Sequence, residues 1–511
     1  MNTSPPQHPV RDPRRWLTLA IVTSALFMVC VDMTVLYTAL PVLTRDLQAT
    51  AAQRLWIVNV YALVVAGLLP GLGTLGDRHG HRRLFLAGLA VFAAASLAAA
   101  LSPSPALLIA ARTLLGAGGA AMMPATLAII RQRFEDPAER NLAIGIWAGT
   151  ASGGLALGPV IGGRLLEQYA WGSVFLVNLP VVATAALLTW RFVPAAPPAG
   201  GARWDLAGSL LVMAGLFGVV FAIKECARRP LSLPILLLAL GVGVLFLWLY
   251  LRQQRRHDTP LIDLGLFRLP GFGAAVAGAA LGTAGIVGFE LVLGQHLQLV
   301  LGRSPLQAGL TILPTPLGSL LAGPLTGRLL PYARASHVGA GGLLLSAIAA
   351  LGLAGLSFDA GLTPGSIALL VAVGAGVGAA ATAASTAIMS AAPPERAGMA
   401  ASIEEVGFEL GSALGVAVFG SLMTIAYAAS LALPGDLAAV LPRVQDALDD
   451  ALRVASTLPQ DAGAALALNA RAAFRTAFHA VLVGAAMLWA ATAVFMLANG
   501  RRRVSARGRA T

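Results

Sequence analysis

Charged residues and cysteines are scarce in this sequence. Asp, Glu, Lys and Arg make up 11% of its 511 residues, whereas a soluble domain carries about 25% charged residues. So small a charged fraction excludes an ordinary soluble enzyme and a disordered chain. With two cysteines, a disulfide framework or a zinc site is implausible. The sequence also lacks a P-loop, a Gly-x-Ser-x-Gly motif and a histidine cluster, so we expect no enzyme activity, metal or cofactor.

Apolar residues dominate the chain instead. They make up 57% of it, and the mean hydropathy is +0.78. These values predict an all-α integral membrane protein, in which each spanning helix needs about 20 apolar residues. Fourteen runs are expected to span the membrane, at residues 16–37, 55–75, 84–102, 105–129, 142–166, 172–192, 205–223, 232–251, 272–293, 306–330, 337–357, 365–390, 398–426 and 474–498. Near span ends, Trp56, Trp147 and Trp171 are expected at the membrane interface.

The net charge of +12 comes from arginines that lie between the apolar runs. This placement indicates membrane topology and not a nucleic-acid partner. With the N-terminus in the cytoplasm, the cytoplasmic segments hold 23 basic residues and the outer segments hold 11. The bias predicts a multi-pass membrane protein with both termini in the cytoplasm.

The sequence contains an internal repeat. Segments 73–78 (Gly-Thr-Leu-Gly-Asp-Arg) and 323–328 (Gly-Pro-Leu-Thr-Gly-Arg) share the spacing of glycine, leucine and arginine. A pair of glycines four residues apart also recurs, as Gly154 and Gly158 and as Gly411 and Gly415. Repeated halves are typical of transporters. We therefore expect two six-helix halves, a two-helix insert and a basic tail, at residues 1–192, 257–498, 193–256 and 499–511. The long outer segment 427–473 is expected to be a loop, with short helices or a hairpin as the alternative.

A glycine-rich, charged connection follows the second apolar run. From Gly73 to Leu84 it reads Gly-Thr-Leu-Gly-Asp-Arg-His-Gly-His-Arg-Arg-Leu, and its glycines permit a tight turn. Asp77 can meet the positive N-terminus of a neighbouring helix or an arginine of another segment. A contact that is made in one conformation and lost in another would gate the protein. The candidate gating residues here are Gly73, Asp77, Arg78 and Gly80. The alternative interpretation is that the basic residues only set the topology.

The fifth apolar run carries glycines on one face of the expected helix. Gly154, Gly158 and Gly162 lie four residues apart, and such a stripe lets a second backbone approach closely. Pro159 removes a backbone donor and bends the helix. Close contact and a bend suit a gate, for which the candidates are Gly154, Gly158, Pro159, Gly162 and Gly163. The alternative is ordinary helix packing.

Acids outnumber bases inside the expected spans. Arg112 is the base, and the acids are Asp32, Glu290, Glu404, Glu405 and Glu409. A buried carboxyl can bind either a proton or a cation, which is the chemistry of exchange. Glu405 and Glu409 share a helix face, whereas Glu404 points about 100° away from Glu405. For Glu290, an interfacial residue that reaches the lipid headgroups is an equally good interpretation.

Together these motifs resemble the major facilitator superfamily, and specifically its fourteen-helix drug–proton antiporters. Segments 37–41, 55–58 and 404–411 look like those of the exporters of quaternary ammonium compounds and methyl viologen. The resemblance implies a proton-coupled multidrug efflux antiporter of the bacterial cell membrane, with cationic drugs and protons as its partners. It also implies that segment 73–84 is a latch, that the glycine–proline segment 154–163 is the antiporter signature, and that Arg112 takes part in proton coupling.

The site candidates combine this resemblance with the chemistry of the residues. The candidates for proton coupling are Asp32, Arg112, Glu405 and Glu409. Tyr37 and Phe408 lie next to acids and are candidates for cation–π contact. The full set of candidates for substrate binding is Asp32, Tyr37, Asn59, Glu404, Glu405, Phe408 and Glu409. Related exporters often have an acid at the position of Asn59, so we expect weaker selectivity for divalent cations.

An alternative function is left open by the sequence. A dedicated exporter of an endogenous metabolite or antibiotic could use the same scaffold. A membrane sensor or channel is disfavoured, because the repeat and the candidate gate are features of transporters. We expect a functional monomer embedded in the lipid bilayer.

Overall fold

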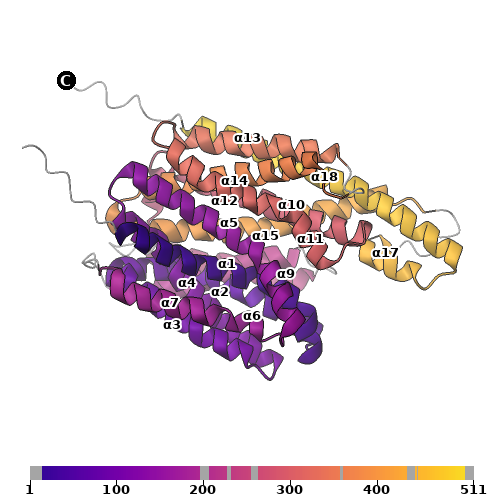
Figure 1. The fold of residues 1–511 in the computed structure, drawn as a ribbon, viewed down its shortest axis with the longest axis horizontal. Helices are drawn as coiled ribbons and strands as arrows, with labels where there is room; N and C mark the ends of the chain where they lie inside the picture. The colour runs from indigo at the N-terminus through magenta and orange to yellow at the C-terminus, as the bar shows by residue number, and fades with distance from the viewer. Residues whose placement is uncertain are drawn as a thin grey trace, which may run out of the picture.

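The structure is a computed structural model that describes residues 14–195, 206–226, 232–254, 263–356, 361–433, 444–445 and 447–500. Within these ranges the regular elements are helices, and most of them run along the long axis of the molecule (Figure 1). Thirteen helical segments there are long and apolar enough to cross a membrane, and residues 207–223 form a shorter apolar helix. The expected all-α membrane architecture is therefore confirmed, whereas a count of fourteen spans stays a prediction.

The helices follow the expected apolar runs, and most extend past them. The first part of the chain forms α1 (Arg14–Asp46), α2 (Ala51–His79), α3 (His81–Ala100), α4 (Pro105–Arg133), α5 (Pro137–Gln168), α6 (Ser173–Leu176), α7 (Asn178–Phe192), α8 (Leu206–Cys226) and α9 (Leu233–Gln254). The second part forms α10 (Phe272–Gln295), α11 (Pro305–Ile312), α12 (Pro314–Leu329), α13 (Ala335–Ala354), α14 (Pro364–Ala391), α15 (Ala397–Ser430), α17 (Leu448–Ala455) and α18 (Gln460–Gly500). Short 3-10 turns at Leu264–Arg268 and Pro394–Arg396 and a π-turn at His296–Val300 complete the set.

Several helices begin directly after a residue whose side chain caps the helix N-terminus. Ser104, Asp136 and Thr363 precede α4, α5 and α14, and each accepts a hydrogen bond from a backbone N–H of the first turn. A proline follows each capping residue. Proline suits this position because the first helical N–H groups lack an intrahelical acceptor.

The repeated glycines occupy equivalent places in two helix pairs. A Cβ atom on Gly154 of α5 would lie 2.7 Å from the carbonyl oxygen of Phe27, on α1. On Gly415 of α15, a Cβ atom would overlap the carbonyl oxygen of Ala284, on α10. In each pair, glycine lets the backbones of the two helices touch. Helix α5 therefore packs on α1 as α15 packs on α10.

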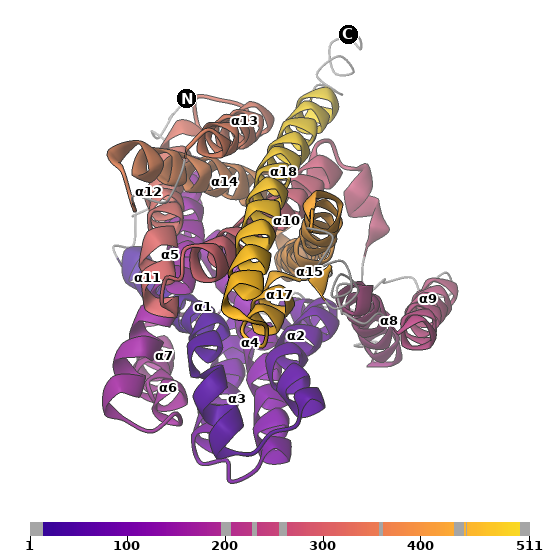
Figure 2. The same ribbon diagram turned by 90° about the vertical axis from the view of Figure 1, so that its right-hand side faces the viewer.

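Helices α8 and α9 lie at one side of the bundle (Figure 2). Helix α8 packs against α2 and α15, and α9 packs on α8. Because α2 precedes the insert and α15 follows it, α8 covers a seam between the first and second parts of the chain.

The segment 427–473 differs from the expected loop. Helix α15 continues to Ser430, α17 packs on α18, and α18 begins at Gln460 rather than at 474. The hydroxyl of Tyr427 donates a 3.2 Å hydrogen bond to the carbonyl of Val444. Helix α17 and the start of α18 extend beyond the bundle on the right of Figure 1. The described residues of this segment are therefore mostly helical, as in the alternative that the sequence left open.

Trp147 is not an interface residue. Its side chain is 3% exposed, and its indole N–H donates a 2.8 Å hydrogen bond to Thr126 Oγ1 on α4. The expectation from its position in the sequence was wrong, because α5 is a long helix and Trp147 lies well inside it. Trp56, by contrast, is 39% exposed.

Candidate functional site

Asp32 and Arg112 form a buried ion pair between α1 and α4, in the first part of the chain. Arg112 Nη1 on α4 donates a 2.7 Å hydrogen bond to Asp32 Oδ2 on α1. The side chain of Asp32 is 0% exposed and that of Arg112 is 2% exposed. Charges removed from water are stable only when they are paired and hydrogen-bonded. The pair thus brings together two residues that the sequence proposed for proton coupling.

Neutral groups complete the surroundings of this pair. Asn178 Nδ2 on α7 donates a 2.9 Å hydrogen bond to Asp32 Oδ1 and a 3.2 Å bond to Ser96 Oγ on α3. Arg112 also donates to the carbonyl of Ile57 and lies over the ring of Tyr61, 4.6 Å from its centroid. Both carboxylate oxygens of Asp32 therefore have partners. The Asp32 side chain is fully buried, although the sequence also proposed it for substrate binding.

The sequence analysis missed Asn178, Ser96 and Tyr61. They are single polar residues in apolar spans, and their positions in the sequence do not indicate that they lie near Asp32. A polar residue at the first position of a helix, as Asn178 is in α7, was the available signal.

Three acids are buried within little more than one turn of α15. Glu404, Glu405 and Glu409 are 0%, 2% and 8% exposed. Ser385 on α14 donates a hydrogen bond to Glu404 Oε1. Glu404 Oε2 and Glu405 Oε1 are buried without a hydrogen-bond partner in the structure. An isolated buried carboxylate is costly, so such groups favour a bound proton or a bound cation.

Helix α15, which carries these acids, packs against helices of the first part of the chain. It contacts α2, which carries Tyr61, and α4, which carries Arg112. The two sets of proposed proton-coupling residues thus lie on helices that pack together across the contact between the two parts of the chain. Glu404 differs from them, because its carboxyl meets α14.

The other substrate-binding candidates are less constrained by the structure. Asn59 and Phe408 are half-buried on α2 and α15. The side chain of Tyr37 lies outside the described residues. Glu290 is half-buried near the end of α10. Among the described residues, His, Cys, Asp and Glu side chains form no group of three that could hold a metal ion.

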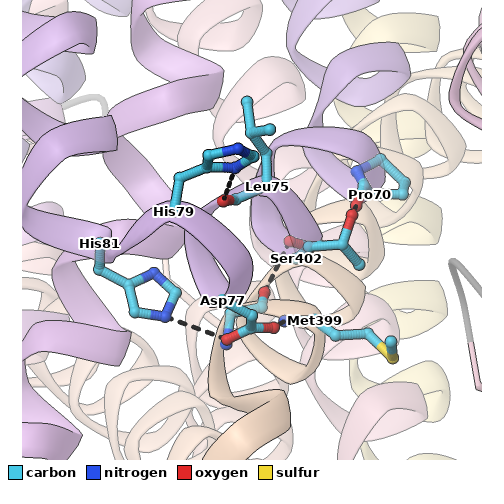
Figure 3. Close-up of polar contacts among 9 residues, drawn as sticks. Pro70, Leu75, Asp77, His79, His81, Met399 and Ser402 are labelled. Carbon is cyan, nitrogen blue, oxygen red and sulfur yellow. Dashed lines mark hydrogen bonds and ion pairs between the residues drawn. The ribbon is translucent and has the colours of Figure 1, made fainter. Parts of the chain in front are cut away.

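Asp77 binds the N-terminus of α15 (Figure 3). Its Oδ1 accepts a 2.8 Å hydrogen bond from the N–H of Gly398, and its Oδ2 accepts a 2.9 Å bond from the N–H of Met399. His81 Nε2, at the start of α3, lies 3.0 Å from Asp77 Oδ1. A carboxylate is stabilised at a helix N-terminus because free N–H groups and the positive end of the helix dipole converge there.

Glycine makes this contact possible. A Cβ atom on Gly73 would lie 2.5 Å from the carbonyl oxygen of Gly398, and a Cβ atom on Gly398 would lie 2.5 Å from His81 Cε1. Neither position therefore has room for a larger residue. Gly80 has φ = 96° and ends α2, a backbone conformation that favours glycine. The side chain of Arg78 is half-buried beside this turn.

The glycine stripe of α5 faces α1. A Cβ atom on Gly158 would lie 2.9 Å from the carbonyl oxygen of Val31, and one on Gly162 would lie 2.7 Å from Val35 Cγ2. Gly163 has more room, with Leu306 Cδ1 nearest at 4.0 Å. Pro159 lies within the continuous helix α5.

Other glycines of α5, which the sequence analysis did not single out, contact the second part of the chain. A Cβ atom on Gly149 would lie 2.6 Å from the carbonyl oxygen of Leu320 on α12. Gly145 of α5 and Gly323 of α12 face each other so closely that a Cβ on either would overlap the other backbone. The two parts of the chain are thus packed together at the α2–α3 end of the bundle.

Comparison with known proteins gives the same family as the motifs. The family model of the Major Facilitator Superfamily matches residues 22–290. The chain is 39% identical over 496 residues to the methyl viologen resistance protein SmvA of Salmonella typhimurium. The matched region covers 96% of this chain and 100% of SmvA. It is 37% identical over 491 residues to the multidrug efflux pump LfrA of Mycolicibacterium smegmatis, with coverages of 96% and 97%.

Two further likenesses extend this result. The tetracenomycin C resistance and export protein of Streptomyces glaucescens is 33% identical over 461 residues, covering 87% of this chain and 83% of that protein. The crystal structure of the human organic anion transporter MFSD10 (TETRAN) has a TM-score of 0.60 at 16% identity, covers 94% of this chain and 100% of that chain, and shares the fold. The relatives support drug efflux, and the family consists of membrane transporters, not enzymes. The chain therefore belongs to the major facilitator superfamily and resembles its multidrug efflux pumps.

Proposed function

We propose that this protein exports lipophilic cations, such as quaternary ammonium compounds and cationic dyes, in exchange for protons. The observation that carries the proposal is the burial of Glu405 and Glu409 on α15, a helix that packs against α2 and against α4, which carries the Arg112 that pairs with Asp32. A cation that enters this region stabilises charged carboxylates and so releases a proton. A proton that returns neutralises a carboxylate and weakens the attraction for the cation.

Asp77 supplies the conformational part of the proposal. Its bond to the N-terminus of α15 holds the α2–α3 end of the bundle closed. We place this end in the cytoplasm, with both chain termini, because the basic residues are concentrated there. Alternating access then requires the contact between Asp77 and α15 to break and reform in each cycle.

The remaining features of the proposal concern assembly. Helix α8 is the fourteenth span, so that two six-helix halves (1–192 and 257–498) flank the insert 193–256. The protein acts as a monomer in the bacterial inner membrane. The resemblance to drug exporters supports this arrangement, as does the equivalent packing of α5 on α1 and of α15 on α10.

Transport assays in inverted membrane vesicles test the function. A proton gradient is imposed, and the uptake of matched cationic, neutral and anionic dyes is measured. We expect gradient-dependent uptake of the cationic dyes and loss of this uptake when a protonophore collapses the gradient. Uptake that persists with protonophore, or a preference for anionic dyes, would contradict the proposal.

A second candidate is the dedicated export of an endogenous metabolite or antibiotic. Its support is the likeness to the tetracenomycin C resistance and export protein. In the same vesicles, this candidate predicts weak uptake of every dye and saturable uptake of one neutral or anionic natural product.

A further inference from the structure

Asn178 has an unusual set of contacts for a residue at the start of a helix. It is the first residue of α7, directly after the short helix α6, and its side chain is 0% exposed. One end of its amide, Nδ2, contacts both Asp32 Oδ1 and Ser96 Oγ. The other end, Oδ1, is buried without a hydrogen-bond partner in the structure. A side chain that served packing alone would not leave a buried acceptor unsatisfied, because this costs about 1–3 kcal/mol.

A side-chain amide can form a hydrogen bond with a carboxyl group in both its charged and its protonated form. It carries a donor at one end and an acceptor at the other, and rotation about its last bond exchanges the two. As a donor, the nitrogen matches a charged Asp32. After rotation, the oxygen accepts a hydrogen bond from the protonated carboxyl. The hydroxyl of Ser96 suits both orientations, because a hydroxyl can accept or donate.

We propose that Asn178 is a positioning residue for proton coupling, whose amide holds Asp32 beside Arg112 in both the charged and the protonated form. This inference rests on the proposed function. The amide neither gains nor loses a proton in the cycle. It lets the proton bind to or leave Asp32 Oδ1 while Oδ2 stays directed at Arg112.

The other described side chain that hydrogen-bonds to Asp32 can donate but cannot accept. Arg112 comes from α4 and donates to Oδ2, and Tyr61 of α2 stacks on the guanidinium. Helix α5 presents glycines to α1, and α15, which packs against α2 and α4, carries the acid Glu409. Cys30 lies on α1 itself. Of the two side chains that donate hydrogen bonds to Asp32 among the described residues, Asn178 is the one that can also accept.

Two variants separate positioning from packing. Asn178→Leu keeps the approximate size and removes both the donor and the acceptor, whereas Asn178→Thr supplies a hydroxyl that can do both. Thr184→Val on the same helix is the control, because the Thr184 hydroxyl bonds to the carbonyl of Pro180, one turn earlier. The readout is proton release from purified protein on addition of a cationic dye, titrated against pH.

We expect Asn178→Leu to release fewer protons than the wild type when the dye binds, because the charged carboxylate of Asp32 loses a hydrogen bond, and a hydrogen bond to a charged group contributes more than one to a neutral group. Asn178→Thr should recover part of the wild-type profile, and Thr184→Val should match it. If Asn178→Leu folds and its profile equals that of the wild type, Asn178 only packs and the inference is wrong.

An infrared measurement on the wild type keeps the test independent of the variants and of transport. The protein is labelled with asparagine that carries ¹³C in the side-chain amide, and difference spectra are recorded between low and high pH. We expect a label-sensitive amide band in the difference spectrum of the wild type that is lost in Asp32→Asn. Absence of the band in the wild type would overturn the inference. Absence of dye-induced proton release in the wild type would instead overturn the proposed function.

Discussion

Asp77 and Met399 are 322 residues apart in the chain, yet Asp77 Oδ2 accepts a 2.9 Å hydrogen bond from the backbone N–H of Met399. The bond joins the end of α2 to the start of α15, and so joins the two parts of the chain. Because the acceptor is a carboxylate and the donor belongs to a helix N-terminus, the contact depends on charge as well as on shape.

Asp77→Asn removes this charge and keeps the size of the side chain. A hydrogen bond to a charged group contributes about 1.5–3 kcal/mol, and about 1.4 kcal/mol corresponds to a tenfold change in an equilibrium. We therefore expect the ratio of the closed to the open state of the α2–α3 end to fall about tenfold. Spin labels on His79→Cys and Glu395→Cys, in a background with Cys30 and Cys226 replaced by alanine, report the distance across this end.

The control for this experiment is Asp46→Asn, an exposed acid at the far end of α1. It should leave the distance distribution of the labels unchanged. A distribution for Asp77→Asn that matches the wild type would show that the carboxylate does not hold this end closed.

Gly398→Ala tests the same contact through shape. The added Cβ atom would lie 2.5 Å from His81 Cε1 and 2.9 Å from Asp77 Oδ1, so the two helices must separate. The spin labels should report a longer distance, and dye efflux should fall about tenfold, as for a change of about 1.4 kcal/mol. On the same helix, Gly420→Ala has no neighbour within 4 Å of the new atom and should behave as the wild type.

Gly158→Leu tests the contact between α5 and α1. At this position even a Cβ atom would lie 2.9 Å from the carbonyl oxygen of Val31, and overpacking costs about 1–3 kcal/mol. We expect coupled transport to be lost while dye binding is partly retained, measured by efflux and by equilibrium dye fluorescence. Gly341→Leu, on an exposed face of α13, should retain both activities. Normal transport by Gly158→Leu would mean that this contact does not change during the cycle.

Glu404 has a contact in the structure that the sequence did not indicate. The sequence grouped it with the substrate-binding residues, but its carboxyl accepts a hydrogen bond from Ser385 on α14. Because Gln can keep this bond, we expect Glu404→Gln to change efflux by less than about twofold and to leave the order of preferred dyes unchanged. A changed order of preference would return Glu404 to the substrate site.

The sequence was sufficient for the fold because its signals are local. Long apolar runs predict membrane helices one at a time, and Asp77 and its glycines form a continuous motif. The partner of Asp77 could be described only as a helix N-terminus or an arginine of another segment, because the choice of α15 depends on how the two parts of the chain dock.

Contacts between distant side chains were beyond the sequence. Asn178 is 146 residues from Asp32, and their contact depends on the packing of α1 against α7. Ser385 and Glu404 meet for the same kind of reason, across α14 and α15. Trp147 shows the opposite error, in which a local rule placed a residue at an interface although its helix buries it.

The central claim is that buried carboxyls, on α15 as well as at Asp32, exchange protons for a cationic substrate, and that Glu409 is one of them. Glu409 lies about 6 Å further along the helix than Glu405, at 1.5 Å of rise per residue. We expect Glu405→Gln to be selective, with dications affected more than monocations, because a second charge on the substrate needs a second carboxylate. Glu409→Gln should impair proton coupling for every substrate.

The most direct measurement is substrate-induced proton release from purified protein, titrated against pH for the wild type, Glu405→Gln, Glu409→Gln and Asp32→Asn. The account predicts that the wild type releases protons when a cationic dye binds, and that Glu409→Gln releases markedly fewer for monocations and dications alike. If Glu409→Gln releases as many protons as the wild type, the proton site is not on Glu409, and Asp32 becomes its leading candidate.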